Sequence, residues 1–110
     1  QGVSFPLAES AMELHAAHLM GLNAVGLLNQ GTPAVKGLSM TKAYLTEIGV
    51  HAVDRTMQAH GAMGFTNEIH LVEAWRLLRA ANVADGTNEI LRRTITQRLF
   101  KGDVEIGGGL

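Results

Sequence analysis

Apolar residues recur along most of the chain at intervals of three or four, the spacing of helices that have one apolar face. This pattern predicts helices over residues 9–30, 39–60, 71–82 and 87–101, after an irregular stretch at residues 1–8. Continuous runs of β-branched and aromatic residues, which are typical of strands, are absent. Short connections between four such helices favour an all-α fold, specifically an up-down four-helix bundle.

The same periodicity predicts which side chains face the core. On the second helix, Leu38, Leu45 and Ile48 fall on one apolar stripe. On the third and fourth helices, Trp75 and Leu99 are expected to point inward, with arginines on the opposite side.

Glycine and proline mark the connections between the helices. Gly31 suits a left-handed cap at the end of the first helix, and Pro33 cannot continue that helix. Gly61 and Gly64 predict unusual backbone geometry before the third helix. Residues 102–110 are rich in glycine and are predicted to form a mobile tail.

Composition narrows the class of protein. A chain of 110 residues is one domain by length, here assigned to residues 1–101. With 9 basic and 10 acidic residues, it has no charge excess suited to nucleic acid or to an anionic membrane. No apolar run is long enough to span a membrane, and the start of the chain does not look like a signal peptide. A soluble, cytoplasmic domain is therefore expected.

The histidines do not form a recognisable metal-binding pattern. His15 and His18 share one helix face, as do Glu47 and His51. A carboxylate-bridged di-metal bundle needs a Glu-x-x-His motif on each of two helices, and the sequence contains none. No metal site is predicted.

Two short stretches admit both an ordinary and a functional interpretation. "ADGTNEI" (84–90) reads as a turn followed by a helix capped by Thr87, and local statistics favour that interpretation. It also places the Asp85 carboxylate at a helix N-terminus, where anions and cofactors bind readily. "QAHGAMGF" (58–65) reads as a capped helix end, or as backbone open to the approach of a phosphate.

Together, these two stretches resemble the C-terminal domain of the acyl-CoA dehydrogenases. That family carries glutamine–x–histidine–glycine–glycine–x–glycine–tyrosine, then an arginine-rich helix, then tyrosine–glutamate–glycine–threonine–x–glutamate/glutamine–isoleucine. Here "QAHGAMGF" and "ADGTNEI" follow in the same order at similar spacing, and "FPLAE" (5–9) is similar to the start of the family's domain. The resemblance covers about residues 5–100.

The resemblance implies that the chain is the last third of a longer FAD-dependent subunit. Such a subunit removes the α-proton of an acyl-CoA thioester and passes the β-hydrogen to the flavin as hydride. The expected partners are the acyl-CoA substrate, the remaining domains or partner subunits, further copies in a dimer or tetramer, and electron-transfer flavoprotein as acceptor. The isolated chain is expected to be inactive.

Site residues are carried over position by position from the family motifs. The catalytic base falls on Asp85, and the substrate-contacting positions fall on Ala84 and Gly86. The resemblance implies FAD contacts at Thr87, Asn88 and Glu89, and contacts with the FAD of a partner subunit at Gln58, Ala59, His60, Gly61 and Ala62.

The sequence departs from the family pattern at several positions. Asp85 replaces the usual glutamate and is one methylene shorter, although some members carry aspartate in an alanine–aspartate–glycine context. Ala84 replaces a tyrosine and should widen the acyl pocket, and Ala62 replaces a glycine. Ala11 and Gln97 stand where the family often has a glutamine and an arginine.

A second interpretation is a structural or oligomerisation subunit without catalytic function. The retained carboxylate at Asp85 favours the catalytic interpretation, because a proton-abstracting enzyme requires a base at that position.

Overall fold

A computed structural model describes residues 1–108, and all regular structure within that range is helical. The chain forms α1 (Ser4–Asn29), α2 (Val35–Ala59), the short 3₁₀ helix η1 (Gly61–Phe65), α3 (Leu71–Ala81) and α4 (Asn88–Phe100). The predicted all-α fold with four main helices is confirmed.

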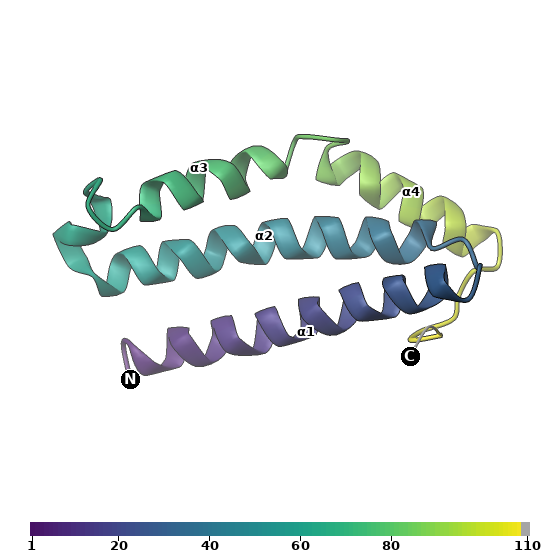
Figure 1. The fold of residues 1–110 in the computed structure, drawn as a ribbon, viewed down its shortest axis with the longest axis horizontal. Helices are drawn as coiled ribbons and strands as arrows, with labels where there is room; N and C mark the ends of the chain where they lie inside the picture. The colour runs from purple at the N-terminus through teal and green to yellow at the C-terminus, as the bar shows by residue number, and fades with distance from the viewer. Residues whose placement is uncertain (109–110) are drawn as a thin grey trace.

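The long helix α2 lies in the middle of the molecule (Figure 1). One side of α2 packs against α1, and the other side packs against α3 and α4, which follow one another end to end. Both α3 and α4 run antiparallel to α2. Among the described residues, α1 makes no packing contact with α3 or α4, so α2 is the helix that joins all the others.

Two helices begin earlier than the apolar pattern predicts. α1 begins at Ser4 instead of residue 9, because Pro6 falls in the first helical turn, where its missing N–H is not needed. α2 begins at Val35 instead of residue 39, directly after the buried Ala34. The sequence-based starts were therefore wrong by four or five residues.

Gly61 and Gly64, both predicted to need glycine, are constrained by different physical causes. Gly61 has a φ of 62°, in the left-handed region that favours glycine, as predicted. Gly64 does not have a positive φ. It is buried instead, and a Cβ there would collide with the carbonyl of Met57, so close packing demands the glycine.

Small residues form the contact between the helices. Ala17, Ala24 and Ala43 are buried, and Ile48 is the largest buried apolar residue, at 4% exposure. A Cβ on Gly37 would lie only 3.5 Å from that of Ala24, so the α1 and α2 backbones approach closely. Among residues 1–108, the core therefore contains no large side chain that is fully enclosed.

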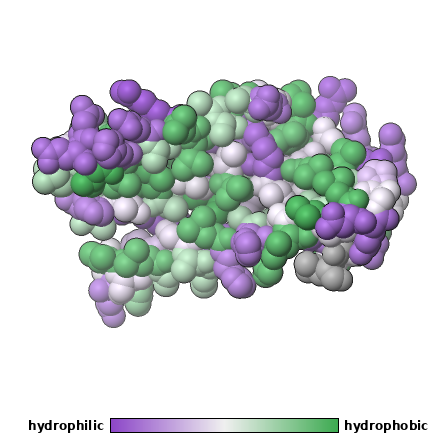
Figure 2. Space-filling view, in the orientation of Figure 1, coloured by the Kyte–Doolittle hydropathy of each residue, from purple (hydrophilic) through white to green (hydrophobic). Residues whose placement is uncertain are grey.

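Most of the large side chains predicted to face the core are instead exposed. Of the stripe on α2, Ile48 is buried but Leu38 and Leu45 are exposed, and Trp75 and Leu99 are also exposed. The prediction that Leu38, Leu45 and Trp75 lie in the core was wrong, because α1 covers one part of the α2 surface and α3 and α4 another, which leaves much of each helix open. Leu99 does face inward, since it lines a cavity between α1, α2 and α4. Figure 2 shows apolar side chains spread over the face turned to the viewer, along α1 as well as α2.

The segment after α4 folds back toward α1 and α2 (Figure 1). The Lys36 Nζ donates to the carbonyl oxygens of Asp103, at 2.7 Å, and Glu105, at 2.9 Å. The predicted mobility of residues 102–110 stays a prediction, and its last two residues lie outside the described range. Within that range, no helix is long and apolar enough to cross a membrane.

Candidate functional site

The Asp85–Gly86 turn between α3 and α4 has an uncommon backbone. Both residues have a positive φ, 54° for Asp85 and 91° for Gly86. Aspartate is one of the few residue types besides glycine that enters the left-handed region readily, at a cost of about 1–2 kcal/mol. Within residues 1–108, the Asp85 side chain makes no hydrogen bond or ion pair, and it is exposed. The turn thus presents a free carboxylate just before α4.

Local groups accept hydrogen bonds from two of the N–H donors at the start of α4. The Thr87 hydroxyl accepts from Ile90 N at 3.2 Å, which confirms the predicted cap. The backbone N–H of Asn88 donates to the Asn82 carbonyl at 3.0 Å. The open donor capacity at this helix end is therefore smaller than for an uncapped helix, and the exposed Glu89 carboxylate lies beside it in the first turn.

Asn88 lies inside the molecule and not on its surface. Its side chain is at the centre of a hydrogen-bond network, with 3% of the residue exposed. The Asn88 Nδ2 lies 2.8 Å from Asn82 Oδ1, 3.0 Å from Thr46 Oγ1 and 3.1 Å from Glu47 Oε2. A buried amide with this many partners fixes α4 against α2.

Lys42 completes this network from α2. Its Nζ donates to Asn88 Oδ1 at 2.9 Å and to the Gly86 carbonyl oxygen at 3.0 Å. Asn82, at the other end of the turn, donates to the Thr46 carbonyl on α2 at 3.2 Å. The sequence interpretation missed Lys42 and Asn82 as part of the site, because partners more than thirty positions apart leave no local pattern.

An ion pair borders the same network. Arg92 donates to both Glu47 carboxylate oxygens, at 2.7 and 2.8 Å. The hydrogen bonds from Arg92, and secondarily from Asn88, hold the pKa of Glu47 below its ordinary value. Glu47, which shares a helix face with His51, therefore pairs with Arg92. The described residues contain no group of three or more side chains that could hold a metal.

The second predicted segment lies at the far end of α2. All five of its residues, from Gln58 to Ala62, are exposed, and a Cβ on Gly61 would meet nothing within 4 Å. The His60 Nδ1 lies 2.8 Å from the Thr56 carbonyl oxygen. Gln58 and Ala59 also line a cavity of about 460 Å³ between the end of α2 and the start of α1.

The structure does not bring the two segments together. Lys42, which contacts the Asp85–Gly86 turn, and Gln58 are on the same helix, sixteen residues apart. At 1.5 Å per residue, this places them about 24 Å apart along α2. One chain could not close both segments around one small ligand, although an extended ligand or two ligands could reach them.

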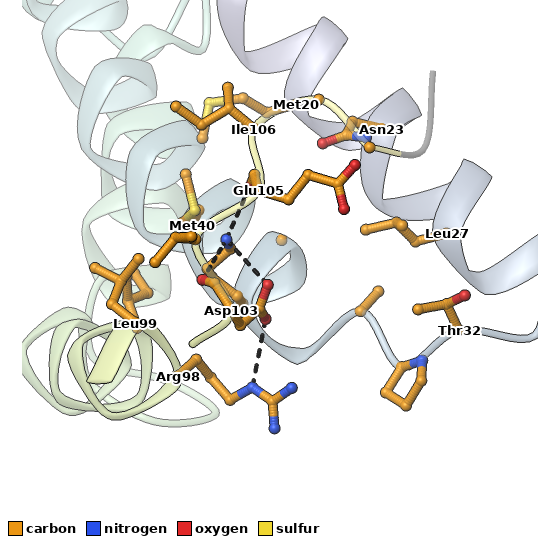
Figure 3. A pocket seen from close by; sticks show the side chains of 18 of the residues that line it. Met20, Asn23, Leu27, Thr32, Met40, Arg98, Leu99, Asp103, Glu105 and Ile106 are labelled. Carbon is orange, nitrogen blue, oxygen red and sulfur yellow. Dashed lines mark hydrogen bonds and ion pairs between the residues drawn. The ribbon is translucent and has the colours of Figure 1, made fainter. Parts of the chain in front are cut away.

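A larger cavity, of about 540 Å³, contains none of the predicted site residues. It lies between the second half of α1, the start of α2, the end of α4 and the segment after α4 (Figure 3). Asp103 pairs there with Lys36 at 3.2 Å and with Arg98 at 3.5 Å, and the Lys36 hydrogen bond holds the pKa of Asp103 below its ordinary value.

Comparison with known proteins identifies a family. The family of the acyl-CoA dehydrogenase C-terminal domain matches residues 1–100. The chain is 31% identical over 101 residues both to the probable acyl-CoA dehydrogenase YngJ of Bacillus subtilis and to the caffeyl-CoA reductase-Etf complex subunit CarC of Acetobacterium woodii. Each alignment covers 92% of this chain and 27% of the relative, so the chain spans about a quarter of the length of these curated relatives.

A solved structure has the same fold. A chain from work on the electron transferring flavoprotein of Acidaminococcus fermentans matches with a TM-score of 0.88 at 23% sequence identity, over 92% of this chain and 27% of that chain. The sequence match over residues 1–100 and the shared helical fold lead to the same conclusion: the chain belongs to the acyl-CoA dehydrogenase family of flavoprotein oxidoreductases, as its C-terminal helical domain.

Proposed function

We propose that this domain supplies the catalytic base of an FAD-dependent acyl-CoA dehydrogenase, and that Asp85 is that base. The observation that carries the proposal is the free, exposed Asp85 carboxylate on a left-handed turn anchored by a buried network. A general base must be able to reach the proton that it abstracts. Within residues 1–108 this carboxylate is not engaged in a hydrogen bond or ion pair, and Lys42 anchors the turn that carries it to α2.

The reaction assigned to Asp85 is a proton transfer from carbon. The Cα–H bond of the acyl thioester breaks, the proton goes to an Asp85 carboxylate oxygen, and the electron pair moves toward the thioester carbonyl. The Cβ–H hydrogen then leaves with its electron pair as hydride, which FAD would accept when bound, and the electron pair from the Cα–H bond forms the Cα=Cβ double bond. Backbone at Gly86 and the small side chain of Ala84 would leave room for the thioester and acyl chain beside the base.

The exposed groups of the domain fit contact with FAD at two separate places. At Gly61 the space that a Cβ would occupy is open, so a phosphate or ring could approach the backbone of residues 58–62. At the start of α4, Thr87 and the exposed Glu89 would face the cofactor, whereas Asn88 would support them from within. FAD, when bound, would accept the β-hydrogen as hydride.

The separation of about 24 Å between these places is one reason to propose FAD sites shared between subunits. In such an oligomer, residues 84–89 would serve one FAD and residues 58–62 the FAD of a partner subunit. We further propose that the domain acts in the cytoplasm within a longer subunit and that electron-transfer flavoprotein accepts the electrons. The naming of one relative as a subunit of an Etf complex supports this acceptor.

The test uses Asp85→Asn in the full-length subunit, with an acyl-CoA thioester deuterated at Cα. Asparagine tolerates the left-handed backbone, so the fold and FAD content should be kept while the base is lost. We expect the rate of flavin reduction under anaerobic conditions to fall by a factor of about 10³ or more, because general-base catalysis contributes about 10²–10⁴. Glu73→Gln, an acid-to-amide change on the exposed surface of α3, is the control and should keep the parent rate.

The second interpretation, a structural subunit of a heteromeric dehydrogenase, predicts the opposite outcome. Turnover of the intact assembly within a few-fold of the parent after Asp85→Asn would overturn the catalytic proposal and favour that role.

A further inference from the structure

Lys42 is the one cation that reaches the backbone of the Asp85–Gly86 turn among the described residues. The Asp85 carboxylate has no partner of its own there, so its position depends on the backbone that carries it. Two successive residues with positive φ are not the intrinsic preference of the chain, and they persist only where surrounding contacts hold them.

Lys42 makes the contact that holds the Gly86 carbonyl to α2, between the contacts of Asn82 and Asn88 with Thr46 at the two ends of the turn. The half-buried ammonium bridges the Gly86 carbonyl oxygen, at 3.0 Å, and Asn88 Oδ1, at 2.9 Å. It therefore joins the exposed part of the turn to the buried part of the Asn88 network. No other side chain in residues 1–108 donates a hydrogen bond to the carbonyl of Gly86.

The bond to Gly86 also sets the direction of the next peptide group. In a trans peptide, the C=O and the following N–H point in opposite directions. With the Gly86 carbonyl drawn toward α2 by Lys42, the N–H of Thr87 points away from α2. Lys42 thus orients the backbone on both sides of Gly86, and with it the Asp85 carboxylate and the Thr87 N–H, without contacting either group.

We propose that Lys42 is a positioning residue for Asp85: its ammonium fixes the Asp85–Gly86 turn, and with it the reach of the base toward the α-carbon of the substrate. This inference rests on the proposed function of Asp85. It adds a specific residue, on a different helix, through which α2 controls the base.

The experiment compares Lys42→Met with the parent in the full-length subunit. Methionine keeps most of the side-chain length but removes the ammonium and both hydrogen bonds. We expect the rate of α-proton removal to fall about 10- to 100-fold, since a misplacement of about 1 Å can cost that much. The isotope effect from deuterium at Cα should rise, whereas a purely structural role would lower the yield of folded protein and leave the isotope effect unchanged.

A measurement without turnover tests the same idea. Hydrogen exchange of the backbone amides in residues 83–91 should speed up in Lys42→Met, whereas exchange in residues 58–62 should not change. Lys101→Met, at the exposed end of α4, is the matched control and should match the parent in all three measurements.

The double variant Lys42→Met/Asp85→Asn separates the two proposals. If Lys42 acts through Asp85, the double variant should be about as slow as Asp85→Asn alone. A normal rate of proton removal, isotope effect and exchange in Lys42→Met, with Asp85→Asn inactive, would overturn the role of Lys42 alone. An active Asp85→Asn would overturn the proposed function itself.

If Lys42→Met does not fold, Lys42→Gln replaces it. The glutamine is shorter and cannot bridge both acceptors, so a smaller loss of rate with the same rise in isotope effect is expected. Parent values in both measurements would contradict the proposal.

Discussion

At the scale of single residues, Asn88 shows how the same side chain is interpreted differently with and without tertiary structure. Its place in the family motif implies a cofactor contact. The structure surrounds it with Lys42, Thr46, Glu47 and Asn82 instead. A buried amide is costly when its partners are removed and stabilising when they are present. The predicted FAD contacts of Thr87 and Glu89 stay predictions, with Asn88 beneath them.

We expect Asn88→Ala to destabilise the fold by about 2–3 kcal/mol, because several buried donors and acceptors lose their partner at once. The free energy of unfolding in chemical denaturant measures this change. Asn67→Ala, at an exposed loop position, is the control and should have little effect. A loss no greater than that of the control would show that the network does not hold α4 to α2.

At the scale of elements, a network of polar contacts binds α4 to α2, whereas α1 packs on α2 through small residues together with one ion pair, Arg55 with Glu13. The bidentate Arg92–Glu47 pair lies on the same side of α2 as Asn88 and Thr46. The contact of α1 with α2 includes the close approach of Ala24 on α1 to Gly37 on α2. The helix that follows the candidate base is therefore positioned by directional hydrogen bonds, which fix its register along α2.

The Arg92–Glu47 pair makes the stability of this contact depend on pH. The pKa of Glu47 is lower in the folded state than its ordinary value of 4.5, chiefly because Arg92 donates to it. As pH falls, the unfolded state therefore takes up the proton first. The stabilisation is complete above about pH 4.5 and is lost as the pH falls through the lower pKa of the folded state.

Glu47→Gln should therefore lower the free energy of unfolding at neutral pH. It should also make that free energy fall less steeply as the pH is lowered. The unfolding midpoints of the parent and the variant should differ at about pH 7 and lie closer together at about pH 3. Glu9→Gln, an exposed change on α1, should follow the parent curve throughout. A difference between parent and Glu47→Gln that is the same at both pH values would contradict the assignment.

At the scale of the whole molecule, the fold is too open to be a compact domain. Its radius of gyration is 16.1 Å, whereas a compact chain of this length has about 13 Å. Phe5 and Leu7 on α1, Leu77 on α3 and Phe100 on α4 are among the large apolar residues that remain exposed. Surfaces of this kind in folded proteins are commonly covered by other domains or subunits.

We expect residues 1–110, produced as a separate polypeptide, to self-associate, bind a hydrophobic dye and bind FAD weakly or not at all. Light scattering and dye fluorescence report the first two properties, and absorbance after desalting reports the third. A polypeptide that stays monomeric and binds no dye would show that the exposed apolar surface does not require another domain or subunit. A stoichiometric yellow complex would contradict the expectation that FAD needs further protein.

The sequence by itself determined the helical class, the order of four helices, the cap at Thr87 and the left-handed turn at Gly61, because these depend on neighbours a few residues away. The sequence also indicated the family, through two motifs in the family's order. Only the tertiary structure decided that Asn88 is buried, that Lys42 holds the Asp85–Gly86 turn and that Leu45 and Trp75 remain exposed. Those outcomes depend on which helices lie beside α2, and residues 36 to 46 positions apart make contacts that no local pattern encodes.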